Sequence, residues 1–74
     1  DMLTENIREL IRRGYSVRFA GSFYADEIDI VVCNRSHQTV RRVPKDILDG
    51  VNLNVDTLMV TILREMAHKL EMSK

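Results

Sequence analysis

The spacing of apolar residues near the amino end of the chain is helical. Ile7, Leu10 and Ile11 stand at positions i, i+3 and i+4, as on one face of an amphipathic helix. Thr4 is a suitable cap for the start of such a helix, and Gly14 can supply the left-handed residue that ends it. The pattern therefore predicts a first helix that ends near Gly14.

The pattern then changes to a period of two, which indicates strands. Tyr15, Val17 and Phe19 alternate with polar residues, as in a strand with one buried face. A more apolar strand is expected over Ile28–Val32, and a third over Gln38–Val43. Because the polar connection at 34–37 has the length of a hairpin loop, we expect these strands to form an antiparallel meander.

The clearest element is a long helix over Val55–Met72, with Asn54 as its cap. A helix of this length spans about 27 Å, whereas a six-residue strand spans about 20 Å. The helix is therefore expected to overhang the sheet. The predicted fold class is α+β: an N-terminal helix, a three-stranded antiparallel meander and a long C-terminal helix packed on the sheet, in one domain over residues 1–74.

Four apolar residues of this helix form a stripe, which consists of Met59, Leu63, Met66 and Leu70. Their spacing of four, three and four positions is that of a coiled-coil seam. The stripe could pack entirely on the sheet of its own chain, or part of it could pair with a second copy or a target protein. Methionine adapts to irregular surfaces, and a domain of this size has a small core that a partner would supplement. We therefore predict a partner surface here, with a homodimer as the simplest case.

Composition narrows the class of protein. The chain has 74 residues, 45% of them apolar and 30% charged, which is typical of a folded domain. Its one cysteine, Cys33, excludes an internal disulfide, and no Cys/His cluster indicates zinc. No apolar run has the roughly 18 residues that a membrane-spanning helix needs. The sequence thus predicts a cytoplasmic domain with no cofactor, no metal and no contact with a membrane.

The charges sum to zero but are unevenly placed. Four basic residues and no acidic residue lie between positions 31 and 45, namely Arg35, Arg41, Arg42 and Lys45. This stretch either contacts nucleic acid or an acidic protein, or it is a solvated strand whose charges oppose aggregation. A neutral chain lacks the positive potential of a general nucleic-acid binder, so a nucleic-acid-associated regulator is the alternative function and not the favoured one.

Two adjacent aromatic residues, Phe23 and Tyr24, follow Gly21 in a predicted turn. They either fold back over the small core or form an exposed contact for a partner. We include them among the candidate partner-binding residues, together with the three arginines Arg35, Arg41 and Arg42.

The residue types that catalysis requires are not arranged for it. His37 and His68 have no carboxylate or cysteine at metal-ligand spacing, and the chain has no nucleophile elbow and no phosphate-binding glycine loop. The sequence therefore predicts a protein that is not an enzyme.

The stretch from Ile7 to Gly21, IRELIRRGYSVRFAG, resembles the opening of several small phage and prophage proteins. In these, a short charged helix passes through a glycine–tyrosine turn into a strand. Some anti-CRISPR proteins are similar, with a helix, three antiparallel strands and a helical end, and the likeness extends to about Val43. The best-known of these inhibitors are strongly acidic and imitate DNA, whereas this chain is neutral with a basic third strand, so DNA mimicry is not expected. The resemblance implies a phage or mobile-element accessory protein that binds and inhibits or regulates a host protein.

Overall fold

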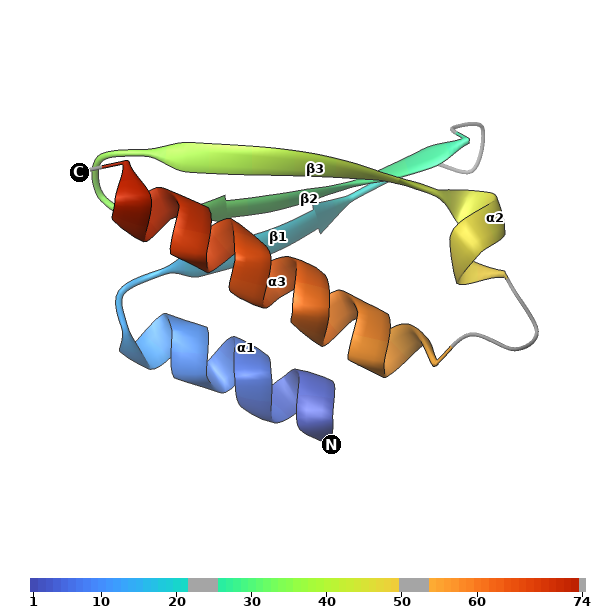
Figure 1. The fold of residues 1–74 in the computed structure, drawn as a ribbon, viewed down its shortest axis with the longest axis horizontal. Coiled ribbons are helices and arrows are strands. Elements are labelled where there is room, and N and C mark those ends of the chain that lie inside the picture. Colours follow the sequence, from blue (N-terminus) through green and yellow to red (C-terminus); the bar gives the residue numbers. More distant parts are fainter. Residues whose placement is uncertain (22–25, 50–53, 74) are drawn as a thin grey trace.

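The computed structural model describes residues 1–21, 26–49 and 54–73. Helices α1 and α3 lie side by side on one face of a three-stranded antiparallel sheet, and the short helix α2 follows the last strand (Figure 1). The predicted α+β architecture is confirmed. The elements in chain order are α1 (Met2–Arg12), β1 (Ser16–Ala20), β2 (Glu27–Cys33), β3 (Gln38–Pro44), α2 (Lys45–Leu48) and α3 (Val55–Met72).

Helix α1 begins earlier than the sequence pattern predicted. The Asp1 carboxylate accepts the backbone N–H of Thr4 at 2.8 Å, so Asp1 is the cap and the prediction that Thr4 caps the helix is wrong. At the other end Gly14 adopts φ +93°, the left-handed conformation predicted for it. The backbone N–H of Tyr15 then donates to the carbonyl of Leu10 at 3.0 Å, which directs the chain into β1.

Strand β2 is central and pairs antiparallel with both neighbours. The register aligns Phe19, Ile30 and Arg41 in one row across the sheet and Val31 beside Val40 in the next. Because residues alternate between the faces of a sheet and Ile30 is fully buried, the first row faces the helices. Val31 and Val40 therefore lie on the opposite face, which no element of the described ranges covers (Figure 1).

The stripe on α3 lies in the core of a single chain. Met59, Leu63, Met66 and Leu70 are between 0% and 7% exposed and belong to the main core cluster. The structure thus corrects the prediction that these four residues are a partner surface. The physical reason is that α3 has two neighbours: it packs on the sheet and also along α1, so both sides of its apolar arc are covered within the chain.

Candidate functional site

The sequence-predicted site residues fall into three groups in the structure. The stripe on α3 is buried, as described above. Arg35 is exposed in the β2–β3 connection, and Arg41 and Arg42 are exposed on β3. Phe23 and Tyr24 lie outside the described residues, so the interpretation of these aromatics stays a prediction.

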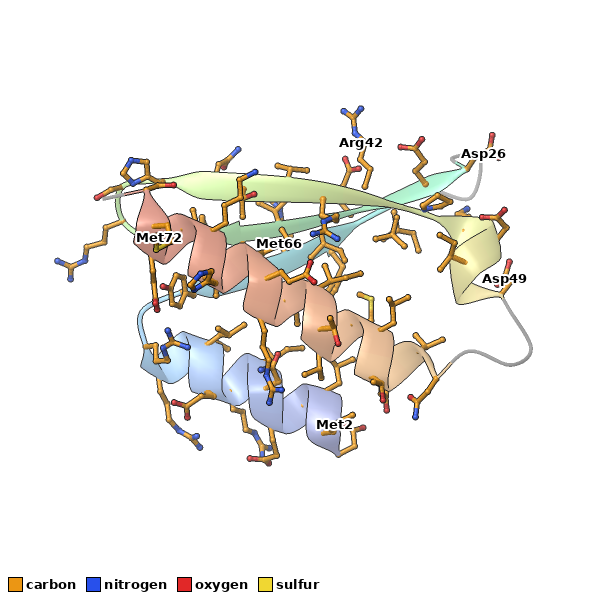
Figure 2. All side chains as sticks on the ribbon, viewed as in Figure 1. Met2, Asp26, Arg42, Asp49, Met66 and Met72 are labelled. Carbon is orange, nitrogen blue, oxygen red and sulfur yellow. The ribbon has the colours of Figure 1, made fainter. Side chains whose placement is uncertain are left out.

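The two arginines of β3 point to opposite faces of the sheet. Arg41, on the helix face, donates from Nη2 to Oε2 of Glu65 on α3 at 2.8 Å. Arg42 projects away from the helices (Figure 2), and its Nε lies 3.5 Å from Oδ1 of Asp29, its cross-strand neighbour. Exposed ion pairs of this kind contribute roughly 0.2–1 kcal/mol each. The basic stretch is therefore divided between two faces, with an acidic residue beside each of these arginines, and this division does not favour the nucleic-acid alternative.

The helix face of the sheet, to which Arg41 points, contains an apolar groove. It lies between the end of β3, helix α2 and helix α3, and has a volume of about 240 Å³. Val43 and Ile62, both buried, belong to its lining, together with the half-buried Leu58 and with Ile47, which is 44% exposed. The polar residues of the lining are Arg41, Arg42, Thr61 and Glu65.

Local backbone structure explains how Ile47 reaches this groove. Pro44 ends β3, and the backbone N–H of Lys45 donates to the carbonyl of Asp26 at 2.9 Å, which fixes the start of α2 beside the sheet. The single turn of α2 then places Ile47 beside α3. The sequence pattern shows no sign of a site at Ile47, which lies outside the periodic stretches, and the spacing of Leu58 in the long helix indicates only an apolar face.

The size of the groove bears on what it can hold. Pockets for small molecules and cofactors usually measure about 300–1,000 Å³ and enclose most of the ligand. A shallower and smaller apolar groove with a charged rim resembles instead the part of a protein interface that receives one or two anchoring side chains. We refer to it below as the β3–α3 groove.

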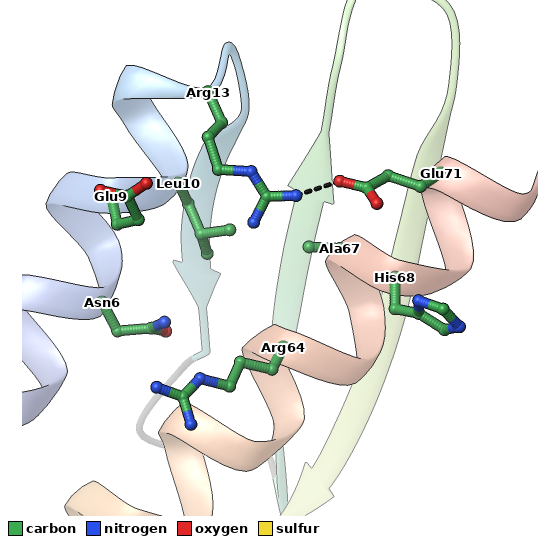
Figure 3. Close-up of a pocket in the computed structure, with 8 residues that line it drawn as sticks. All are labelled: Asn6, Glu9, Leu10, Arg13, Arg64, Ala67, His68 and Glu71. Atoms are coloured by element: carbon green, nitrogen blue, oxygen red, sulfur yellow. Dashed lines mark hydrogen bonds and ion pairs between the residues drawn. The ribbon is translucent and has the colours of Figure 1, made fainter.

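A second hollow, of about 330 Å³, lies along the seam between α1 and α3 (Figure 3). The buried residues Leu10 and Ala67 belong to its lining. At one end Arg13 forms an ion pair with Glu71, so the end of α1 is joined to the end of α3. The full lining is Asn6, Glu9, Leu10, Arg13, Arg64, Ala67, His68 and Glu71. Because its best-defined polar contact joins two elements of the fold, we interpret this seam as structural.

Tyr15 completes the polar contact at the end of this seam. Its hydroxyl donates to Oε1 of Glu71 at 3.0 Å, and the guanidinium carbon of Arg13 lies 5.4 Å from the centre of its ring. Burial of the phenol raises the pKa of Tyr15 above its ordinary value, and the hydrogen bond and negative charge of Glu71 raise it further, while Arg13 acts in the opposite direction. The neutral form of Tyr15 is thus the form that the fold favours.

Stability should consequently fall at alkaline pH. Because the pKa of Tyr15 is raised in the folded state, its contribution is fully present below the unfolded value of about 10 and is lost as the pH rises through the folded value. Urea unfolding between pH 8 and pH 11 should show this decline, and the decline should be smaller in Tyr15→Phe. If the free energy of unfolding fell equally steeply with pH in the two proteins, this role of Tyr15 would be contradicted.

Comparison with protein-family models, curated proteins and solved structures gave no match for this chain. None of the helices in residues 1–21, 26–49 and 54–73 has both the length and the apolar character required to span a membrane. Among the same residues, no three His, Cys, Asp or Glu side chains are grouped so that they could hold a metal ion.

Proposed function

We propose that this chain is a non-enzymatic protein-binding module that receives an apolar side chain of its partner in the β3–α3 groove. The observation that carries the proposal is the exposure of Ile47 beside the half-buried Leu58, in a groove that Val43 and Ile62 also line. An isoleucine left 44% exposed beside such a groove loses water contact when a partner covers it.

The energy available from this contact suits a small interface. Full burial of a side chain of this size contributes roughly 1.5–3 kcal/mol, and covering the exposed part of Ile47 contributes a fraction of that. A partner side chain that enters the groove adds its own burial. Together these contributions reach the scale of about 2 kcal/mol that defines a hot spot in a protein interface.

The charges beside the groove favour an acidic group next to the partner's apolar anchor. Arg41 points to the helix face, where the groove lies, and it donates to Glu65 through Nη2, so its guanidinium keeps other donors for a further carboxylate. We therefore propose a partner segment that presents an apolar side chain flanked by Asp or Glu.

The biological setting that we propose rests on the resemblance of Ile7–Gly21 to small phage and prophage proteins. In this setting the chain is a cytoplasmic accessory protein of a phage or mobile element, and it binds a host protein and inhibits or regulates it. In such a protein the groove would be the contact for the host target.

Site-specific photocrosslinking tests the proposal. With a photoreactive amino acid at position 47, the chain should crosslink to a discrete protein in a lysate of its host, whereas the same group at Ile11, an exposed residue of α1, should not. Ile47→Asp should then weaken binding of the identified protein about ten- to hundredfold, since each 1.4 kcal/mol corresponds to tenfold.

The matched control is Ile11→Asp, which introduces the same charge at an exposed isoleucine outside the groove. Circular dichroism should show that both variants are folded. A partner that binds Ile47→Asp as tightly as it binds the unchanged chain would overturn the proposal.

A further inference from the structure

The outer edge of β3 is a second surface, distinct from the β3–α3 groove. β3 pairs with β2 along one edge, and no strand of the described ranges lies beside its other edge (Figure 1). Hydrogen bonds at the two ends of the β2–β3 ladder show which residues of β3 direct their backbone N–H and C=O groups toward that free edge. At one end the N–H of Asn34 donates to the carbonyl of His37 at 3.0 Å, and at the other the N–H of Lys45 donates to the carbonyl of Asp26 at 2.9 Å.

These two hydrogen bonds define the alternation between them. Hydrogen-bonded pairs alternate with non-hydrogen-bonded pairs in an antiparallel ladder, and the register from 27/44 to 33/38 is continuous. The backbone groups of Thr39, Arg41 and Val43 are therefore directed toward β2. Those of Gln38, Val40 and Arg42 are directed outward, and all three residues are exposed.

Pro44 marks the end of the usable edge. It lies two residues after Arg42 and, like Val40 and Arg42, occupies an outward position of the strand. The N–H that proline lacks would have pointed outward, so its absence removes no hydrogen bond from the β2–β3 ladder. A strand added to β3 can consequently exchange hydrogen bonds with three residues of β3, from Gln38 to Arg42.

We propose that this edge pairs antiparallel with the same edge of a second copy, centred on Val40, to form a continuous six-stranded sheet. A two-fold axis through the Val40 pair is perpendicular to the sheet and is the symmetry of an isologous dimer. It places Val40 opposite Val40 of the second copy and Gln38 opposite Arg42 of the second copy. Every outward N–H and C=O between Gln38 and Arg42 then has a partner.

Charge and proline placement select this register among the symmetric ones. An axis at Arg41 or at Arg42 would place identical arginines directly opposite each other, which is unfavourable. The Arg42 register would in addition place Pro44 opposite Val40 and lose a donor. An axis at Thr39 would leave the outward groups of Arg42 opposite the turn at Ser36. Only the Val40 register uses all three residues without opposing like charges.

Apolar contact supports the same register. Val40 is 48% exposed on the sheet face opposite the helices, beside Val31 of β2. Pairing of two Val40 side chains joins them to Val31 of each copy in one apolar strip across the sheet. The arginines of β3 do not prevent this approach, because Arg41 and Arg42 each have an acidic neighbour.

Sedimentation analysis of three proteins tests the dimer. The unchanged chain should show a concentration-dependent equilibrium between monomer and dimer. Val40→Pro should weaken self-association about tenfold or more, because it removes both central donors while leaving the β2–β3 ladder intact. Val40→Thr keeps the N–H and the branched side chain and should still form dimers.

Amide hydrogen exchange on the unchanged chain gives a readout that does not depend on the folding of a variant. Raising the protein concentration should slow exchange of the Gln38, Val40 and Arg42 amides at least tenfold, while Thr39, Arg41 and Val43 are slow throughout. A monomer at about 1 mM, or a dimer in which the three outward amides exchange freely, would overturn the inference. Ile47→Asp should leave the dimer unchanged, so this inference and the proposed function can fail separately.

Discussion

Met66→Asp should leave the chain largely unfolded at 25 °C and pH 7. Met66 is 3% exposed and belongs to the core cluster, so the substitution removes apolar contacts and places a carboxylate where it has no partner. An uncompensated buried charge costs about 3–5 kcal/mol or more. A chain of 74 residues has a total stability of roughly 4–11 kcal/mol, so this loss takes most of it.

Far-UV circular dichroism and urea titration measure this effect. Arg64→Asp is the matched control, because it introduces the same carboxylate two positions earlier at an exposed site of the same helix. It should change the unfolding free energy by less than about 1 kcal/mol. If Met66→Asp instead remained folded and changed only the oligomeric state, the stripe would be a partner surface after all.

The stripe shows why sequence pattern alone could not assign its partner. Spacing of four, three and four residues describes one side of a helix, whatever covers that side. Here the covering elements are the sheet and α1, which are distant in sequence and reach α3 only through the tertiary fold. The pattern therefore predicted which residues of α3 are apolar and aligned, but not whether they face the same chain or another.

Local signals were more informative about the elements themselves. Asn54 caps α3, its Oδ1 accepting the N–H of Thr57 at 3.1 Å, and the helix spans Val55–Met72 as predicted. Gly14 has the predicted left-handed conformation. These features depend on a few neighbouring residues, so the sequence contains all the information that they need.

The candidate site depends on contacts that have no such local signal. The alternation of a strand predicts that Arg41 and Arg42 face opposite sides, which the structure confirms. Their acidic neighbours could not be predicted, because Asp29 is brought to Arg42 by the strand register and Glu65 is brought to Arg41 by the position of α3. The β3–α3 groove likewise forms only where residues of β3, α2 and α3 come together in the fold, so Ile47 was missed.

Leu10→Ala should lower the free energy of unfolding by about 2–5 kcal/mol, the usual cost of truncating a fully buried leucine. Leu10 is 1% exposed and is the only buried residue within α1, where Leu3 and Ile7 are only partly buried against the core. The attachment of α1 thus depends largely on one side chain. The neighbouring Ile11→Ala is the control: Ile11 is 58% exposed, and its truncation should cost less than about 0.5 kcal/mol.

Amide exchange distinguishes detachment of α1 from a uniform loss of stability. In Leu10→Ala the amides of α1 should lose more protection than those of β2, because α1 can separate from α3 while the sheet keeps the rest of its core. Equal loss in both elements would mean that the domain unfolds only as a whole. Either result bears on the stripe of α3, since α1 is the neighbour that covers one flank of α3 beside the sheet. If α1 detaches, the side of α3 that it covers becomes available to a partner.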